Sequence, residues 1–216
     1  MPTSDPVDDP APLSRRERKK LETRDRIVDC AVSLFASRGY EATTMDDIGE
    51  CADVARATVF NYFARKDDIV TEWFARRRAD LARELATAEQ HTTHTPDRLR
   101  HAFRGLARLF DNDPDTARAV VRAWLRAGGP LRPDTSATPT VFADTIRRGQ
   151  DQGDIPPDID ATRAGFVLFD AYLGVLYRWV ADETDQFPFE ENLLASLTML
   201  LTGLLHPGER TSSARR

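Results

Sequence analysis

The stretch TTMDDIGECADVARATVFNYFARK, at residues 43–66, is rich in side chains that can bond to nucleic acid. Arginine and asparagine form paired hydrogen bonds with base edges, and threonine can bond a base or a phosphate. Residues 55–63 have the spacing of a short helix whose inner face carries Val59, Tyr62 and Phe63. The outer face would carry Arg56, Ala57, Thr58, Phe60 and Asn61. A short helix with such a face fits the major groove of DNA, which is about 12 Å wide.

A second short helix is expected directly before this one. Thr44 and Asp47 have the residue types and the spacing of a capping box, which would start that helix. Ile48 and Ala52 then continue an apolar face at helical spacing. Residues 51–54 would form the turn between the two helices. The whole stretch therefore predicts a helix-turn-helix.

A longer helix is expected to support this motif from the N-terminal side, over about residues 20–37. Ile27, Ala31 and Phe35 give it an apolar stripe. A basic run at residues 15–20 precedes it. That run is either an arm that contacts phosphates or the minor groove, or a solvated first turn of the helix.

The distribution of charge along the chain agrees with a nucleic-acid partner better than the net charge does. The chain has 216 residues and a net charge of −5. Residues 15–26 nevertheless hold seven bases and three acids, beside the helix-turn-helix where phosphates would lie. The acidic remainder favours solubility and limits indiscriminate binding.

The composition indicates a soluble globular protein, with 41% hydrophobic and 30% charged residues. The sequence contains neither a run of about 18 apolar residues nor a signal-peptide pattern, so no membrane span is expected. Cys30 and Cys51 are too few for a disulfide framework. We therefore expect a reducing, cytoplasmic setting.

Residues 23–69 resemble the DNA-binding domain of TetR-family transcriptional repressors. The resemblance rests on a long spaced pattern and covers about a fifth of the chain. The residues that carry it are Arg24, Ile27, Leu34, Phe35, Gly39, Tyr40, Thr43, Thr44, Ile48, Ala52, Val54, Thr58, Phe60, Tyr62, Phe63, Lys66 and Ile69. It implies an N-terminal three-helix DNA-binding domain and a helical body that binds a ligand and forms a homodimer.

The motif divides into two kinds of DNA contact. The resemblance implies contacts to the phosphate backbone at the starts and ends of the helices, at Thr43, Thr44, Tyr62 and Lys66. The candidates for reading bases are on the outer face of the second helix, at Arg56, Ala57, Thr58 and Asn61. Among these, Arg56 is the best candidate for a guanine edge. Two alternatives stay open: Thr58 could bond its own helix, and Tyr62 could belong partly to the core.

Three residues depart from the family pattern. Asp53 occupies the position of a turn glycine, although aspartate tolerates left-handed backbone better than most residues. Ala55 stands where serine or threonine often caps the recognition helix, and the loss of such a cap costs about 1 kcal/mol. Phe60 replaces a tyrosine and lacks its hydroxyl, but the ring can contact a thymine methyl group.

The rest of the chain is expected to form helices separated by proline and glycine, without strand-like alternation. Thr95, Asp113 and Asp160 are the expected start signals for three of them. The fold class is therefore all-α, with about nine helices. The predicted organisation is a disordered tail at 1–14, a helix-turn-helix DNA-binding domain at 15–66, a helical effector-binding and dimerisation domain at 67–206 and a flexible tail at 207–216.

The segment of residues 160–182 is apolar nearly all round, which is typical of a helix buried on more than one side. Gly165 and Gly174 would allow close approach of other helices. A leucine-rich amphipathic helix follows at about residues 190–205. The resemblance implies that these two helices form a four-helix bundle with their copies in a second subunit. A monomeric core is the alternative.

A ligand pocket is expected among the aromatic residues of the body. The candidates are Trp73, Phe103, Phe110, Trp124, Phe142, Phe166, Phe169 and Tyr172. Asp170 joins them as an acid within an apolar helix. It could bind a polar or cationic group of a ligand, or it could pair with an arginine across a dimer.

The other function classes find little support in the sequence. We find no phosphate-binding loop, nucleophile elbow or paired Glu-x-x-His, so an enzyme is not expected. His91, His94 and His101 have metal-like spacing, but no cysteine or acid cluster completes a site, and a solvated loop is favoured. Neither a metal nor a cofactor is predicted.

The sequence thus predicts a regulator that binds a palindromic DNA operator as a homodimer and is released by a small hydrophobic effector. A DNA-binding regulator without an effector is the main alternative.

Overall fold

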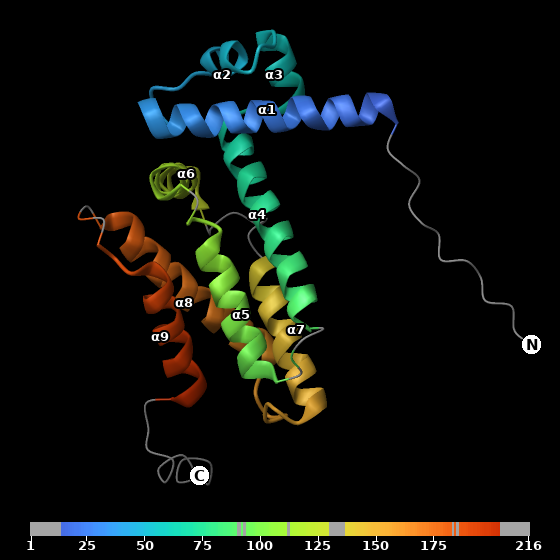
Figure 1. Ribbon diagram of the computed structural model, residues 1–216, viewed down its shortest axis with the longest axis vertical. Helices are drawn as coiled ribbons and strands as arrows, with labels where there is room; N and C mark the ends of the chain where they lie inside the picture. The colour runs from blue at the N-terminus through green and yellow to red at the C-terminus, as the bar shows by residue number, and fades with distance from the viewer. Residues whose placement is uncertain are drawn as a thin grey trace, which may run out of the picture.

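The computed structural model describes residues 14–89, 92, 94–111, 113–129, 137–182, 184 and 186–203. Within these ranges the chain forms nine α-helices and no strand, which confirms the all-α prediction. A head of three helices stands on a body of five, and one long helix joins them (Figure 1). Most of the two predicted tails and His91 lie outside the described residues.

The head consists of α1 (Arg15–Arg38), α2 (Met45–Cys51) and α3 (Arg56–Tyr62). α1 begins earlier than expected, because Ser14 and Glu17 form a capping box: the Ser14 hydroxyl accepts a hydrogen bond from the Glu17 N–H. The basic run at residues 15–20 is therefore the helical start of α1, and not an extended arm. Thr44 and Asp47 form the predicted capping box of α2.

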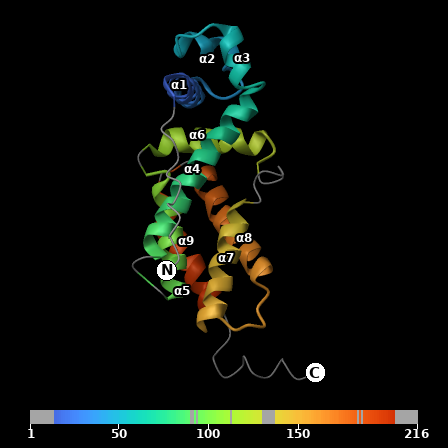
Figure 2. The same ribbon diagram turned by 90° about the vertical axis from the view of Figure 1, so that its right-hand side faces the viewer.

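The connecting helix α4 (Lys66–Glu89) runs from the head into the body (Figure 1). The body consists of α5 (Thr95–Arg108), α6 (Pro114–Arg126), α7 (Ala137–Gln152), α8 (Ala161–Ala181) and α9 (Phe189–Thr202). Figure 2 shows α6 lying across the molecule, between the head and the remaining body helices. α1 packs against α6, so the head rests on the body as well as on α4.

Two body helices begin as the sequence predicts, and a third does not. The carboxylates of Asp113 and Asp160 each accept a hydrogen bond from the backbone three residues on, and so cap α6 and α8. Thr95 does not cap α5; it is the buried first residue of that helix. Its N–H and hydroxyl donate to Asp154 Oδ2, at 2.8 and 3.0 Å. A carboxylate distant in sequence thus stabilises this helix start.

α7 and α8 pack closely at Gly165. A Cβ at this position would lie 2.4 Å from the Pro139 carbonyl oxygen, which explains why the close approach requires glycine. Among the described helices, α8 alone is long and apolar enough to span a membrane by length and composition, with a mean hydropathy of 1.3. Half of that apolar window is buried inside the protein, as in the core helix of a helical bundle.

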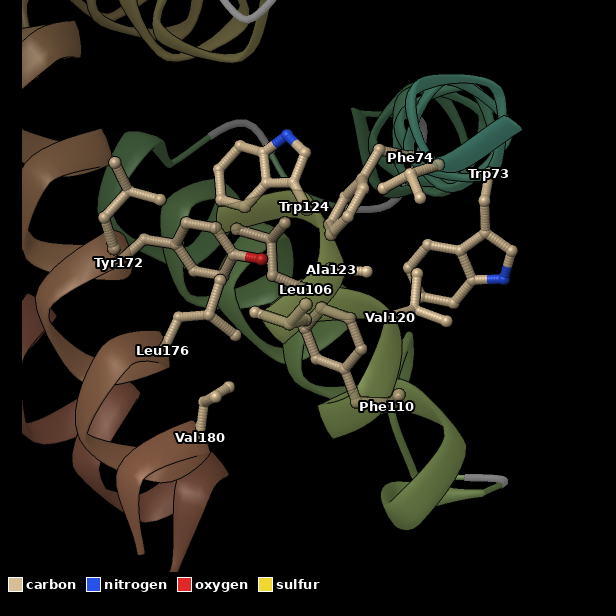
Figure 3. Packing of buried hydrophobic residues seen from close by; sticks show 14 of the residues in the cluster. Trp73, Phe74, Leu106, Phe110, Val120, Ala123, Trp124, Tyr172, Leu176 and Val180 are labelled. Carbon is tan, nitrogen blue, oxygen red and sulfur yellow. The ribbon is translucent and has the colours of Figure 1, made fainter. Parts of the chain in front are cut away.

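Aromatic rings join α4 to the body. Phe74 packs against Trp124 of α6 with ring centres 4.8 Å apart, and Trp73 stacks on Phe110 at 6.3 Å. Figure 3 shows these rings pointing toward a common centre between the helices. The apolar core is continuous from Ile27 in α1 to Leu197 in α9.

Candidate DNA-binding surface and ligand cavity

The turn of the helix-turn-helix is held by backbone geometry. Asp53 has a φ of +51°, so it adopts the left-handed conformation expected at the position of a turn glycine. The Val54 N–H donates to the Gly49 carbonyl oxygen at 3.0 Å. A Cβ at Gly49 would lie 3.1 Å from the Val54 oxygen and 3.3 Å from a methyl group of Val59. The small residue therefore lets α3 pack directly on α2.

The two faces of α3 match the predicted division. Val59 and Phe63 are buried, and Tyr62 is half-buried against the same core. Tyr62 therefore belongs partly to the core, which was the alternative left open for it. As expected, Ala55 gives α3 no side-chain cap. The exposed residues of the outer face are Arg56, Ala57, Phe60 and Asn61.

Arg56, the best candidate for base reading, is tethered to its neighbours on the head. Its Nη1 lies 2.8 Å from Asp46 Oδ2 of α2, and its guanidinium lies 5.4 Å from the centre of the Phe60 ring. The arginine and aspartate side chains are 66% and 56% exposed. Ion pairs this exposed contribute about 0–1 kcal/mol, so the tether orients Arg56 without preventing its movement to a base. The sequence reading did not identify Asp46.

Thr43 and Thr58 have opposite environments. Thr43 is 1% exposed, and its hydroxyl donates to the Gly39 carbonyl at 2.8 Å. The structure thus places the Thr43 side chain in the interior, where it holds the loop before α2 and does not face a phosphate. The Thr58 hydroxyl forms no hydrogen bond with any residue that the structure describes, so it does not bond its own helix there.

Thr44 and the start of α1 are exposed. The Thr44 hydroxyl donates to Asp47 Oδ2 at 2.6 Å, and this bond lowers the pKa of Asp47. Cationic side chains cover the first turns of α1, at Arg15, Arg16, Arg18, Lys19 and Lys20, all of them exposed. Both features leave polar groups at the surface of the head.

Lys66 bridges the loop between α1 and α2. Its Nζ lies 2.7 Å from the carbonyl oxygens of Tyr40 and Thr43, and 4.4 Å from the centre of the Tyr40 ring. The Tyr40 hydroxyl donates to Asp67 at the start of α4, and burial together with this bond raises the pKa of Tyr40. A lysine ammonium has three donors, so one proton is left for the predicted phosphate contact.

An ion cluster fixes α1 to α4. Arg24 makes two hydrogen bonds to the Glu72 carboxylate, at 3.0 and 2.8 Å. Arg76 lies 3.3 Å from the same carboxylate and 2.8 Å from Asp25. The Arg24 hydrogen bond lowers the pKa of Glu72. Because bidentate charged pairs fix direction as well as distance, the first turns of α4 belong mechanically to the head.

A cavity of about 40 Å³ lies between α4, α5, α6, α7 and α8. This space holds only a few water molecules, so a larger ligand must widen it. Four predicted pocket residues line it: Phe110, Trp124, Phe169 and Tyr172. Figure 3 shows Phe110, in the turn after α5, directed toward Trp124 of α6 and Tyr172 of α8. Burial raises the pKa of Tyr172, so its phenol stays protonated and can donate a hydrogen bond.

Five predicted pocket residues lie elsewhere, which corrects the expectation. Phe103 and Phe142 are fully buried and pack on each other with ring centres 5.6 Å apart. Trp73 borders a separate cleft between the head and α6. Phe166 is 49% exposed and Asp170 is also exposed, because both lie on the outer face of α8.

The sequence reading also missed part of the cavity lining. The missed residues include two arginines and a threonine as well as apolar residues, and they are Phe74, Arg77, Arg78, Leu106, Leu109, Thr138, Leu173 and Leu176. Helical spacing was the available signal. Phe74 and Arg78 are four residues apart on α4, as are Leu106 and Phe110 on α5 and its end.

Among the residues that the structure describes, no group of three or more histidine, cysteine, aspartate or glutamate side chains could hold a metal. His94 is exposed, with its Nδ1 3.7 Å from Asp97. His101 lies on α5.

The fold and these two sites define a class of protein: a one-component regulator, with a helix-turn-helix head joined by one helix to a helical body. The model of the family described as "Bacterial regulatory proteins, tetR family" matches residues 27–72. The HTH-type transcriptional regulator TcmR of Streptomyces glaucescens is 30% identical over 161 residues, covering 73% of this chain and 67% of that protein. The chain belongs to the TetR family, and it is a DNA-binding transcriptional regulator of the repressor type.

Further relatives extend over most of the chain. The HTH-type transcriptional repressor KstR of Rhodococcus jostii is 24% identical over 199 residues, covering 90% of this chain and 87% of that protein. The crystal structure of Thermus thermophilus FadR, a TetR-family repressor in complex with lauroyl-CoA, aligns with a TM-score of 0.65 and 27% identity, covering 85% of this chain and 95% of that chain. Bacillus halodurans FadR aligns with a TM-score of 0.72 at 19% identity, covering 85% and 97%, and supports the fold.

Proposed function

We propose that a homodimer of this chain binds a near-palindromic operator through two copies of α3, and that a small hydrophobic ligand in the body releases it. One observation carries this proposal: α4 takes part in both sites. Its first turns are bonded to the head through Lys66, Asp67 and Glu72. Phe74, on the next turn, lines the cavity. A difference in affinity of about 1–3 kcal/mol between two head positions is enough to couple the sites.

The outer faces of α8 and α9 support the homodimer. They expose large apolar side chains at Phe166, Val167, Tyr177, Met199 and Leu200, with exposed fractions between 37% and 59%. A Cβ at Gly174 would meet nothing within 4 Å, so this part of α8 leaves space for a second backbone. Large apolar side chains exposed on two helices that contact each other favour a two-fold pair of these helices.

The base-reading role is assigned to Arg56, Thr58 and Asn61, with Phe60 and Ala57 making apolar contacts. The exposure of Arg56, Ala57, Phe60 and Asn61 on α3 supports this assignment. Thr58 is half-buried, but its hydroxyl forms no hydrogen bond with any residue that the structure describes. Phosphate contacts are proposed for Thr44, Tyr62, Lys66 and the basic start of α1. Thr43 is proposed to act through the loop that its side chain holds.

The lauroyl-CoA bound to Thermus thermophilus FadR supports a ligand with a long apolar part. The alternative is a repressor without an effector, and the small cavity of about 40 Å³ favours it. A thermal-shift screen with apolar ligands distinguishes the two. Stabilisation by any of them supports an effector, whereas its absence across the screen supports the alternative.

The proposal is tested by selecting binding sites from random DNA with the purified protein at a stated salt concentration. We expect a palindrome whose half-sites are about 34–36 Å apart or somewhat further, corresponding to one turn of DNA or more. Light scattering should give a dimer. The variant Phe166→Asp serves as the control, since it should give monomers that select single half-sites weakly. A folded, dimeric protein that enriches no sequence contradicts the proposal.

A further inference from the structure

Two buried residues with hydroxyl groups line the cavity. Tyr172 of α8 is 6% exposed, and Thr138 of α7 is 7% exposed. Neither hydroxyl forms a hydrogen bond with any residue that the structure describes. Figure 3 shows the Tyr172 oxygen directed from α8 toward Leu106 and Trp124, which also line the cavity. Buried polar groups are nearly always hydrogen-bonded, so two such hydroxyls on one apolar cavity require an explanation.

The other polar groups of the cavity wall already have partners. The Arg77 guanidinium lies 4.9 Å from the centre of the Trp73 ring. Arg77 also borders the cleft between the head and α6, together with Asp29 and Asp113. Arg78 has an interaction partner of its own, and the remaining lining residues are apolar. A charged ligand would therefore compete with existing partners of the arginines, whereas a neutral ligand would meet two hydroxyl groups and apolar surface.

The positions of the two hydroxyl groups are set by the packing of α7 on α8. Pro139, the neighbour of Thr138, makes the close backbone approach to Gly165. Tyr172 follows Gly165 by seven residues, which is about two helical turns, so both lie on the same face of α8. Thr138 and Tyr172 therefore line the cavity from two helices in close contact. Groups that are held in place before binding lose little freedom when a ligand bonds to them.

The chemistry of these two hydroxyl groups favours a ligand with a hydrogen-bond acceptor. Burial raises the pKa of Tyr172, so its phenol keeps its proton and remains a donor. The threonine hydroxyl can donate as well. A carbonyl oxygen has two lone pairs and can accept a hydrogen bond from both groups at once. A ligand without an acceptor would leave both donors unmatched when it replaces water beside them, which lowers its affinity.

We propose that the cavity binds a neutral, largely apolar molecule that carries a carbonyl group, and that the hydroxyls of Tyr172 and Thr138 donate hydrogen bonds to the carbonyl oxygen. This inference rests on the proposed function and names the chemical class of its effector. The apolar part of the molecule packs against Leu106 and Trp124, which line the cavity from α5 and α6. Since a cavity of about 40 Å³ holds only a few water molecules, entry of such a molecule widens it.

The first experiment uses the protein without ligand. Tyr172→Phe removes one hydroxyl and keeps the ring, so the melting temperature should stay the same or rise. Tyr177→Phe is the matched control, because Tyr177 lies on the same helix, is 37% exposed and is not among the lining residues. One lost hydrogen bond lowers the melting temperature of a chain of this length by about 3 °C. A fall of that size in Tyr172→Phe alone would mean that the hydroxyl already has a partner, and it overturns the inference.

The second experiment measures the binding of three probes to the wild-type protein by calorimetry and by tryptophan fluorescence. Methyl heptyl ketone carries the carbonyl group. Its alkene isostere has the same shape, with a methylene group in place of the oxygen, and nonanoate carries a negative charge. We expect the wild-type protein to bind the ketone more tightly than nonanoate. Tighter binding of nonanoate, or no binding of the ketone, overturns the inference.

The same probes then test the two hydroxyl groups. Tyr172→Phe should weaken binding of the ketone by about fivefold, the equivalent of one neutral hydrogen bond, and leave binding of the alkene unchanged. Thr138→Val should act in the same direction. Thr145→Val is its matched control, because Thr145 is buried on the same helix and its hydroxyl already donates to the Val141 carbonyl oxygen. If Tyr172→Phe weakens the ketone and the alkene equally, or leaves the ketone unchanged, the inference fails.

Operator binding by the unliganded protein separates this inference from the proposed function. A dimer that binds a palindrome, but whose Tyr172 does not distinguish the ketone from the alkene, retains the function and loses the inference. A protein whose Tyr172 makes that distinction but that binds no operator retains this recognition of a carbonyl group and loses the function.

Discussion

The head and the body of this molecule are held by different kinds of contact. In the head, named polar pairs fix each junction: Lys66 with two carbonyl oxygens, Tyr40 with Asp67, and Arg24 with Glu72. The body also has a polar junction, Thr95 with Asp154, but its central junctions are aromatic rings in contact. Hydrogen-bonded charges define direction, whereas ring contacts tolerate several offsets. A domain that must present its recognition helix to DNA at a fixed spacing needs hydrogen-bonded charges. A domain that opens around a ligand needs ring contacts.

The largest effect is expected in the body. Phe103 is fully buried and packs on Phe142 away from the cavity. Phe103→Ala should lower the free energy of unfolding by about 3–5 kcal/mol, because it removes apolar contacts and leaves a hole. Urea denaturation measures this loss. Phe103→Leu is the matched variant, with an expected smaller loss. A loss below about 1 kcal/mol for Phe103→Ala would mean that the body repacks far more freely than its rings indicate.

The contact of Lys66 with the loop between α1 and α2 is tested by Lys66→Met, which keeps the aliphatic part of the side chain. We expect a loss of about 2–3 kcal/mol in unfolding free energy, since two carbonyl oxygens lose a charged donor. The slope of the logarithm of DNA affinity against the logarithm of salt concentration should also fall by about one, because one phosphate contact is lost. Lys20→Met, on the exposed start of α1, should affect only DNA binding. An unchanged salt slope in Lys66→Met would show that Lys66 does not contact DNA. Unchanged stability would show that its bridge to the loop does not stabilise the head.

The base-reading role of Arg56 gives an effect of similar or smaller size. Arg56→Ala should relax the preference at one base position by about 1–3 kcal/mol, as measured by repeating the site selection. Asp46→Ala is the control, because it frees Arg56 from its tether without removing the guanidinium. The same preference at every position in Arg56→Ala would show that other residues read the operator.

The ion cluster predicts a dependence on pH. Arg24 lowers the pKa of Glu72 below its ordinary value of 4.5. A depressed pKa in the folded state gives stability that is complete above that ordinary value and is lost as the pH falls through the folded value. Glu72→Gln should therefore cost about 1–2 kcal/mol at pH 7 and flatten the acid-side decline in melting temperature. Glu50→Gln, exposed on α2, should leave that decline intact. A decline unaltered by Glu72→Gln would contradict the role of this pair.

The smallest expected effect is a gain in the stability of the head. Ala55 has φ −61° and ψ 146°, the extended geometry of a capping residue, but provides no side-chain oxygen. Ala55→Ser should stabilise the head by about 0.5–1 kcal/mol. Thermal unfolding followed by circular dichroism measures the gain, with Ala57→Ser inside α3 as the control that should give none. Equal shifts in the two variants would mean that capping is not the cause.

The head could be predicted from the sequence because its determinants are local. The capping box of Thr44 and Asp47, the left-handed Asp53 and the uncapped Ala55 each depend on residues within one or two turns. Thr95 shows the limit of such reasoning. Its type and place beside Pro96 suggested a cap, but a carboxylate brought near by folding takes its hydrogen bonds.

The cavity could be predicted only in part because it depends on packing between helices. Aromatic residue type identified Phe110 and Trp124 but could not separate them from Phe103, which fills the core. Asp170 was a pocket candidate, with pairing across a dimer as the alternative, because its helix is apolar nearly all round, yet part of that apolar surface and Asp170 itself face outward. Arg77 and Arg78 were missed because charges on a connecting helix usually face water.

The close contact at Gly165 sets the mechanics of the molecule. Since α7 and α8 meet backbone to backbone there, they form the closely packed wall of the cavity. Under the proposed function, the opposite wall, α4, would be the part that moves. Lys66 and Arg77 are eleven residues apart on α4, which corresponds to a lever arm of roughly 16 Å. α1 rests on α6, so, under the proposed function, a small tilt of α4 at the cavity would move the recognition helix sideways. In the proposed homodimer the two movements would add, so the distance between the recognition helices would change by twice the movement of either one.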